Sequence, residues 1–90
     1  MKSARFLSAM KKDVKRIKRR GYNTDKLALI FDLLCASEPL PPIARPHLLH
    51  GEWRGHWECH IAPDWLLIYK ITTNEIILAR TGTHADLFKE

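Results

Sequence analysis

The 90-residue chain has no long apolar run, and nothing near its start has the form of an export signal. A helix that crosses a membrane needs about 20 consecutive apolar residues, and no stretch of the sequence approaches that length. The first residues are rich in lysine and arginine, but no apolar segment with a small-residue cleavage pattern follows them. We therefore expect a cytoplasmic protein without a membrane partner. The length fits one domain over residues 1–90.

The sequence also lacks the patterns of common metal and nucleotide sites. Cys35 and Cys59 are far apart and match no metal spacing, and no His-Glu-x-x-His motif is present. A glycine-rich phosphate loop is missing, as is the Gly-x-Ser-x-Gly turn of serine hydrolases. We expect both thiols to be reduced and buried as small apolar groups. No metal and no small-molecule cofactor is predicted.

Acidic residues are scarce in the first third of the chain. Residues 1–26 carry a net charge of +8, whereas residues 27–90 carry −3, which accounts for the overall +5. A concentrated basic segment beside a nearly neutral body suggests a polyanion or an acidic protein as partner. The alternative is a basic helix face that is merely solvated.

Two amphipathic helices are predicted in the N-terminal half. The first covers residues 8–20, with Ser8 as the expected cap and Gly21 as the left-handed stop. The second covers residues 25–37, with Asn23 or Thr24 as its cap and the following prolines as its stop. Apolar residues recur in both helices at three- and four-residue steps. These residues are Leu7, Met10, Val14, Ile17, Leu27, Ile30, Phe31 and Leu34.

Strand patterns dominate the C-terminal half. Residues 52–61 alternate, with Trp53, Trp57 and Cys59 expected on one face and polar side chains on the other. The apolar run 65–71 predicts a central strand, and a short polar gap at 72–74 joins it to a strand over 75–80. Residues 2–6 are expected to add a short first strand, and residues 38–51 form an irregular, proline-stiffened connector.

The element order is therefore (β)ααβββ, followed by a short C-terminal turn or helix. Helices first and strands afterwards indicate an α+β fold of two layers, with a helical hairpin packed on an antiparallel sheet.

Five polar residues remain as candidates for chemistry: His47, His60, Asp64, Arg80 and His84. Closure of the hairpin is expected to bring Asp64 and Arg80 together. Histidines with an arginine suit cleavage of RNA through its 2′-hydroxyl, because a base, an acid and an oxyanion partner are all needed. Trp65 and Phe88 are candidates for stacking on a base. From these residues alone, ordinary surface histidines remain the alternative.

Three motifs resemble the YafQ branch of the RelE/ParE superfamily of bacterial toxins. They are residues 47–55 (HLLHGEWRG), 60–70 (HIAPDWLLIYK) and 80–88 (RTGTHADLF). Members of this branch are mRNA interferases that cut mRNA in the ribosomal A site and are neutralised by a cognate antitoxin. Because the sequence has no metal-ligand spacing, we expect the cleavage to be metal-independent. The resemblance therefore implies a RelE-like fold, endoribonuclease activity that inhibits translation, and three partners: antitoxin, ribosome and mRNA.

The resemblance also implies roles for individual residues. His47, His60, Asp64 and His84 match active-site positions, with His84 as the general acid and with His47 or His60, aided by Asp64, as the base. A further set matches positions that support the substrate or transition state, namely Trp65, Arg80 and Phe88. In the basic helix, we expect RNA or antitoxin contacts from Lys15, Arg16 and Arg19.

Two rival functions stay open. One is a non-catalytic toxin on the same fold, similar to the gyrase-inhibiting members of the superfamily; those lack this set of acid and base residues. The other is a module that binds RNA or antitoxin through its basic helix without any chemistry, which would not require His84 or Asp64.

Overall fold

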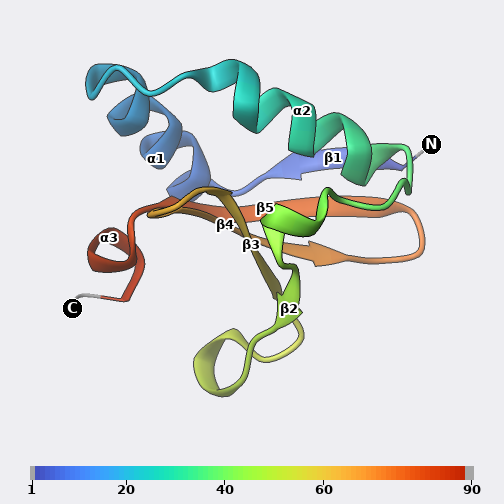
Figure 1. Ribbon diagram of the computed structural model, residues 1–90. Helices are drawn as coiled ribbons and strands as arrows, with labels where there is room; N and C mark the ends of the chain where they lie inside the picture. Colours follow the sequence, from blue (N-terminus) through green and yellow to red (C-terminus); the bar gives the residue numbers. More distant parts are fainter. Residues whose placement is uncertain (1, 89–90) are drawn as a thin grey trace.

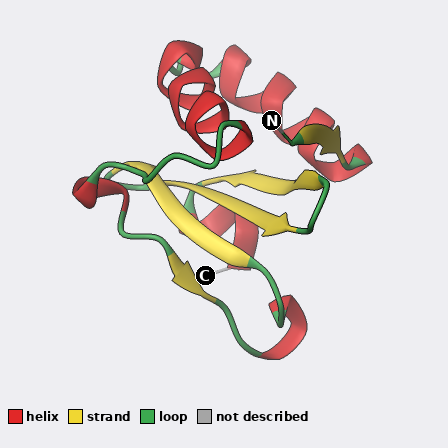
Figure 2. Cartoon of the chain, turned by 90° about the vertical axis from the view of Figure 1, so that its right-hand side faces the viewer, coloured by secondary structure: helices red, strands yellow, loops and turns green. Residues whose placement is uncertain are grey.

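Two helices cover one face of a five-stranded sheet in the computed structural model, which describes residues 2–88 (Figure 1). The helices are α1 (Ser8–Arg19) and α2 (Thr24–Cys35). The strands are β1 (Ser3–Phe6), β2 (His47–Leu48), β3 (Trp57–Ala62), β4 (Trp65–Ile71) and β5 (Glu75–Gly82). The short helix α3 (His84–Phe88) lies on the side of the sheet away from α1 and α2 (Figures 1 and 2). The predicted two-layer α+β fold is confirmed.

The strand order is β1-β5-β4-β3-β2, so the predicted central strand β4 lies in the middle. Strands β2 to β5 pair antiparallel, but β1 runs parallel to β5. The predicted strands thus form an antiparallel sheet, and the parallel edge strand β1 makes the whole sheet mixed. A four-residue edge strand carries no sequence signal for its direction, which depends on where α1 must begin in order to cover the sheet.

Side chains of β4 alternate between two apolar clusters. Trp65, Leu67 and Tyr69 face the helices and pack in the larger cluster with Met10, Ile17, Leu27 and Ile30. Leu66 and Ile68 point the other way, toward a smaller cluster that includes Leu87 of α3. All five residues from 65 to 69 are buried, as expected for a strand that is covered on both faces.

The helix ends agree only in part with the predictions. Gly21 has a φ of +80°, as the left-handed stop of α1 requires, and the Asn23 side chain accepts a hydrogen bond from the backbone N–H of Asp25. Ser8, however, is already the first helical residue and does not cap; Leu7 occupies the cap position without a side-chain bond. Helix α2 ends at Cys35 before any proline, and Ser37 then adopts a φ of +57°.

The connector contains more structure than was predicted. It forms two 3₁₀ turns, η1 (Pro42–Ala44) and η2 (Gly51–Trp53), with strand β2 between them. The strand expected at 52–61 therefore begins only at Trp57. Trp53 packs in the smaller cluster rather than on the face of Cys59, because η2 interrupts the alternation.

Both cysteines are free and buried, as expected. Burial raises the pKa of the Cys59 thiol to about 12, so it stays protonated at neutral pH. Among residues 2–88, every helix is too short or too polar to span a bilayer.

Candidate functional site

Asp64 and His84 form a hydrogen-bonded pair at the open end of the β4–β5 hairpin. The hairpin register pairs Leu66 with Gly82, and continuing it by two residues places Asp64 opposite His84. His84 Nδ1 lies 2.9 Å from Asp64 Oδ1, and the backbone N–H of His84 donates to the same oxygen at 3.2 Å. The bond from the His84 ring is the main cause that lowers the pKa of Asp64. The carboxylate on Nδ1 fixes the orientation of the His84 ring.

Two further rings stand beside His84. The centroid of the His60 ring on β3 is 6.3 Å from that of His84, and the Phe88 ring is also at 6.3 Å. His60 pairs with Leu66 in the β3–β4 register, so it lies on the sheet face opposite the helices. The structure thus brings together four of the residues predicted for the site: His60, Asp64, His84 and Phe88.

His47 lies on the same sheet face, but its ring is engaged elsewhere. Its Nδ1 is 3.2 Å from the carbonyl oxygen of Arg45, and its Nε2 is 3.4 Å from Oε1 of Glu58, its neighbour across the β2–β3 pair. Glu58 was expected on an exposed polar face, yet it is only 5% exposed. Both groups that face the His47 ring are acceptors, an arrangement that suits a donor rather than a base. Of the two predicted bases, His60 is therefore the better placed.

Arg80 does not lie beside Asp64, contrary to the expectation from hairpin closure. It pairs with Ile68, because β5 runs two residues beyond the predicted end and the register shifts after Ile68. Its Nε and Nη2 donate to Asp13 at 2.6 and 3.1 Å. These bonds are the main cause that raises the pKa of Arg80.

Asp13 is a buried carboxylate that was not predicted from the sequence. It is 1% exposed, and it also accepts the backbone N–H of Thr81 at 3.1 Å. Helix α1 therefore supplies a partner to β5 at a point beyond the end of β1. The signal was present, since Asp13 stands three residues after Met10 and four before Ile17, within the buried stripe of the helix.

Arginines at the C-terminal end of α1, including the cap residue Arg20, bind a carboxylate of α3. Arg20 donates two bonds to Asp86 at 2.6 and 2.9 Å, and this is the main cause of an Asp86 pKa well below its usual range. Arg16 lies 3.2 Å from Asp13 and 3.9 Å from Asp86. Arg16 was predicted to bind substrate, but it faces these two carboxylates. Lys15 and Arg19 remain exposed.

The start of α3 depends on a close approach of Asp86 to Gly82. Thr83 Oγ1 accepts the N–H of Asp86 at 3.1 Å, while Asp86 Oδ2 accepts the N–H of Thr83 at 3.0 Å. This reciprocal pair has the form of a capping box. A Cβ added at Gly82 would lie 2.8 Å from Asp86 Oδ2, and Gly82 has a φ of +152°. Glycine at this position therefore allows the turn that presents His84.

Trp65 is part of the core. It is 4% exposed, its Nε1–H donates to Thr81 Oγ1 at 2.9 Å, and its ring packs edge-on against Tyr22 at 5.0 Å. The predicted stacking of Trp65 on an RNA base does not agree with this burial. Phe88 is half-buried beside His84 and keeps a ring near the site.

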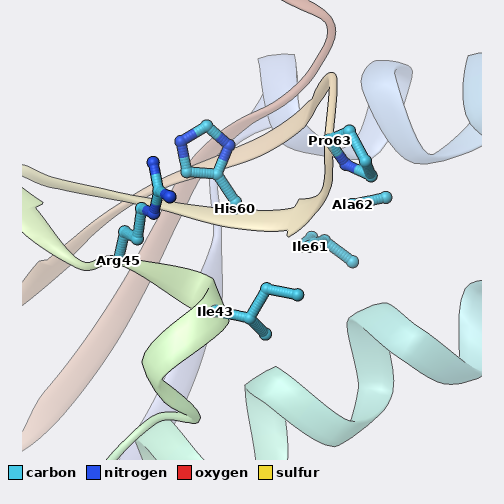
Figure 3. A pocket seen from close by; sticks show the side chains of 6 residues that line it. All are labelled: Ile43, Arg45, His60, Ile61, Ala62 and Pro63. Carbon is cyan, nitrogen blue, oxygen red and sulfur yellow. The ribbon is translucent and has the colours of Figure 1, made fainter.

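A hollow of about 350 Å³ opens beside His60 (Figure 3). Its lining residues are Ile43, Arg45, His60, Ile61, Ala62 and Pro63. Arg45 was not among the predicted site residues, because β2, which follows it, has no recognisable strand pattern. Within residues 2–88, no three His, Cys, Asp or Glu side chains converge as they do around a metal ion.

A family model described as the bacterial toxin of a type II toxin–antitoxin system, YafQ, matches residues 2–89. The mRNA interferase toxin YafQ of Escherichia coli K12 is 44% identical over 78 residues, which cover 86% of this chain and 85% of that protein. Both matches agree with the resemblance seen in the motifs of residues 47–88.

Solved structures share the fold over nearly the whole chain. A chain of the E. coli DinJ–YafQ toxin–antitoxin complex matches with a TM-score of 0.89 and 39% identity, covering 97% of both chains. A copper-bound mutant toxin from Helicobacter pylori matches with a TM-score of 0.93 and 34% identity, covering 98% of this chain and 100% of that one.

Proposed function

Because the chain belongs to the YafQ family of bacterial toxins from type II toxin–antitoxin systems, we propose that it cuts mRNA with His84 as general acid and His60 as general base. As a member of this family the chain is a toxin and an mRNA interferase, an endoribonuclease that inhibits translation. The observation that carries the proposal for the mechanism is the proximity of the His60 and His84 rings, with Asp64 hydrogen-bonded to His84.

The two histidines are spaced to flank one phosphodiester. His60 takes the proton of the ribose 2′-hydroxyl, and the 2′ oxygen attacks phosphorus while the bond to the 5′ oxygen breaks. His84, protonated and held through Nδ1 by Asp64, gives its proton to the leaving 5′ oxygen. The products are a 2′,3′-cyclic phosphate and a 5′-hydroxyl.

Arg80 supports the transition state in this scheme. Its Nε and Nη2 are committed to Asp13, while Nη1 makes no hydrogen bond with any residue from 2 to 88. The register places Arg80 on the same sheet face as His60, through the paired residues Leu66 and Ile68. A guanidinium fixed on one side and open on the other is suited to stabilise charge on a phosphate oxygen.

Cleavage takes place in the ribosomal A site, in the cytoplasm, and a cognate antitoxin neutralises the toxin. The E. coli YafQ–DinJ complex supports an antitoxin partner. A non-catalytic toxin on the same fold is the alternative. That function would not require His60, His84 and Asp64 to lie close together.

The products of cleavage test the proposal. Ribosome-bound mRNA treated with the toxin should give upstream fragments that end in a 2′,3′-cyclic phosphate and downstream fragments that begin with a 5′-hydroxyl. A chelator selective for transition metals should leave the rate of mRNA cleavage unchanged. This control is included because a similar toxin from H. pylori was solved with copper bound. Downstream fragments with a 5′-phosphate would instead indicate attack by water and contradict the mechanism.

The exposed lysine and arginine side chains of α1 contact the ribosome or the antitoxin and do not contact the phosphodiester that is cut. Lys15 and Arg19 are exposed and make no ion pair in the described part of the chain. Arg16 is left out of this set of contacts because its side chain faces Asp13 and Asp86.

Reversing Lys15 and Arg19 to glutamate should weaken ribosome binding and flatten its salt dependence. Each phosphate contact contributes roughly 0.7–0.9 to the slope of log K against log salt, since bound counterions are released. The matched control reverses Arg54 and Lys70, which are also exposed but lie outside α1. Equal affinities and slopes for the two double variants would show that α1 has no special part in binding the ribosome.

A further inference from the structure

Arg45 stands at one end of the hollow beside His60, and apolar groups form the rest of its wall. Figure 3 shows the Arg45 side chain and the His60 ring together at one end, with Ala62 and Pro63 at the other. The pairing of His47 with Glu58 explains this, because continuing the β2–β3 register by two residues sets Arg45 opposite His60. The hollow therefore adjoins the proposed base directly.

The charge of Arg45 has no partner in residues 2–88. Its side chain is exposed and forms no ion pair or hydrogen bond there. Its backbone adopts a left-handed φ of +47° between η1 and β2, and its carbonyl oxygen contacts His47 Nδ1. A charged side chain without an internal partner, on a backbone fixed at both ends, suits the binding of an external anion.

The wall of the hollow is apolar enough to receive a base or a sugar. Ile43 is 83% exposed, an unusual position for a large aliphatic side chain beside an arginine. The volume of about 350 Å³ lies near the lower end of the ~300–1,000 Å³ typical of small-ligand sites, which fits one nucleotide. Single-stranded RNA is commonly recognised through unstacked bases held on such surfaces, with cations on the backbone.

We propose that this hollow binds the nucleotide next to the scissile phosphate, with Arg45 on the backbone phosphate and Ile43 and Pro63 against the base or sugar. The proposal rests on the proposed function and adds a substrate subsite to it. Arg45 acts in ground-state binding here and takes no part in proton transfer. Removing the Arg45 charge should therefore raise KM while kcat stays the same.

Binding of a short RNA with a single 2′-deoxy substitution at the cleavage position, which cannot be cut, tests the subsite. Arg45→Gln should raise the Kd about 10- to 100-fold, as expected for losing charge-assisted hydrogen bonds, and Arg45→Lys should fall between it and the wild type. Glutamine is as tolerant of the left-handed backbone as arginine, so the fold should not change. The control is Arg54→Gln, an exposed arginine between η2 and β3 that lies outside the hollow.

The outcomes separate this proposal from the proposed function. Equal Kd and KM for Arg45→Gln and Arg54→Gln would overturn the subsite, even if cleavage and its dependence on His84 are intact. Weakened binding of antitoxin with unchanged binding of RNA would also overturn it and make the hollow a protein contact. Conversely, a wild-type protein that binds the 2′-deoxy RNA through Arg45 but leaves ribosome-bound mRNA uncut would retain the subsite and refute the mechanism.

Discussion

Replacing His84 by alanine should lower the rate of mRNA cleavage about 100- to 10,000-fold, the usual contribution of a general acid. The side chain is 47% exposed and bonds to an Asp64 carboxylate that is itself 65% exposed, so little packing is lost with it. The melting temperature and antitoxin binding should therefore stay close to those of the wild type. Cleavage per folded molecule and melting temperature, measured on one sample, check both statements.

His84→Gln should be as inactive as the alanine variant, because an amide can donate a hydrogen bond but cannot act as an acid. The control is His50→Ala, which removes an exposed histidine of the connector that makes no hydrogen bond or ion pair with the described residues. A folded His84→Ala protein that cleaves at the wild-type rate would remove this residue from the mechanism.

Replacing Asp13 by alanine should lower the free energy of unfolding by about 3 kcal/mol, near the low end of the range for breaking a buried ion pair. The variant leaves the buried N–H of Thr81 without its acceptor and Arg80 without its carboxylate. Arg80 is 23% exposed and retains some access to water, which moderates the loss. For a domain of this size the melting temperature should fall by roughly 12–24 °C.

Chemical denaturation measures the effect of Asp13, with Asp32→Ala as the control. Asp32 is an exposed residue of α2, so its removal should change stability by no more than about 0.5 kcal/mol. If the two variants unfold at the same denaturant concentration, Asp13 does not hold β5 and Arg80 as the structure indicates.

The helices and the β4–β5 hairpin could be predicted because their residues repeat with a clear period. Met10 and Ile17 mark the buried stripe of α1, and the buried run of β4 is followed by a turn in which Thr72 N–H bonds to the carbonyl of Glu75. Strand β2 has only two residues and no period, so neither its pairing nor the position of Arg45 opposite His60 could be predicted.

The contacts of the polar residues were harder to predict than their grouping. His60, Asp64 and His84 meet because antiparallel pairing closes the hairpin ends, which follows from the strand pattern. Arg80 was misplaced because the length of β5 and the register shift after Ile68 leave no trace in the sequence. Asp13 was overlooked because a charged residue in an apolar stripe is usually taken as solvated, whereas its partners come from 67 and 68 residues further along the chain.

A substrate with sulfur in place of the leaving 5′ oxygen distinguishes a general acid from a residue that only supports the site. A thiol has a pKa near 8.5, so the sulfur departs without needing a proton. Cleavage of this substrate by His84→Ala on programmed ribosomes should return to within about tenfold of the wild-type rate, while His60→Ala stays impaired because the 2′-hydroxyl still needs a base. An equal defect of His84→Ala on the oxygen and sulfur substrates would contradict proton donation by His84.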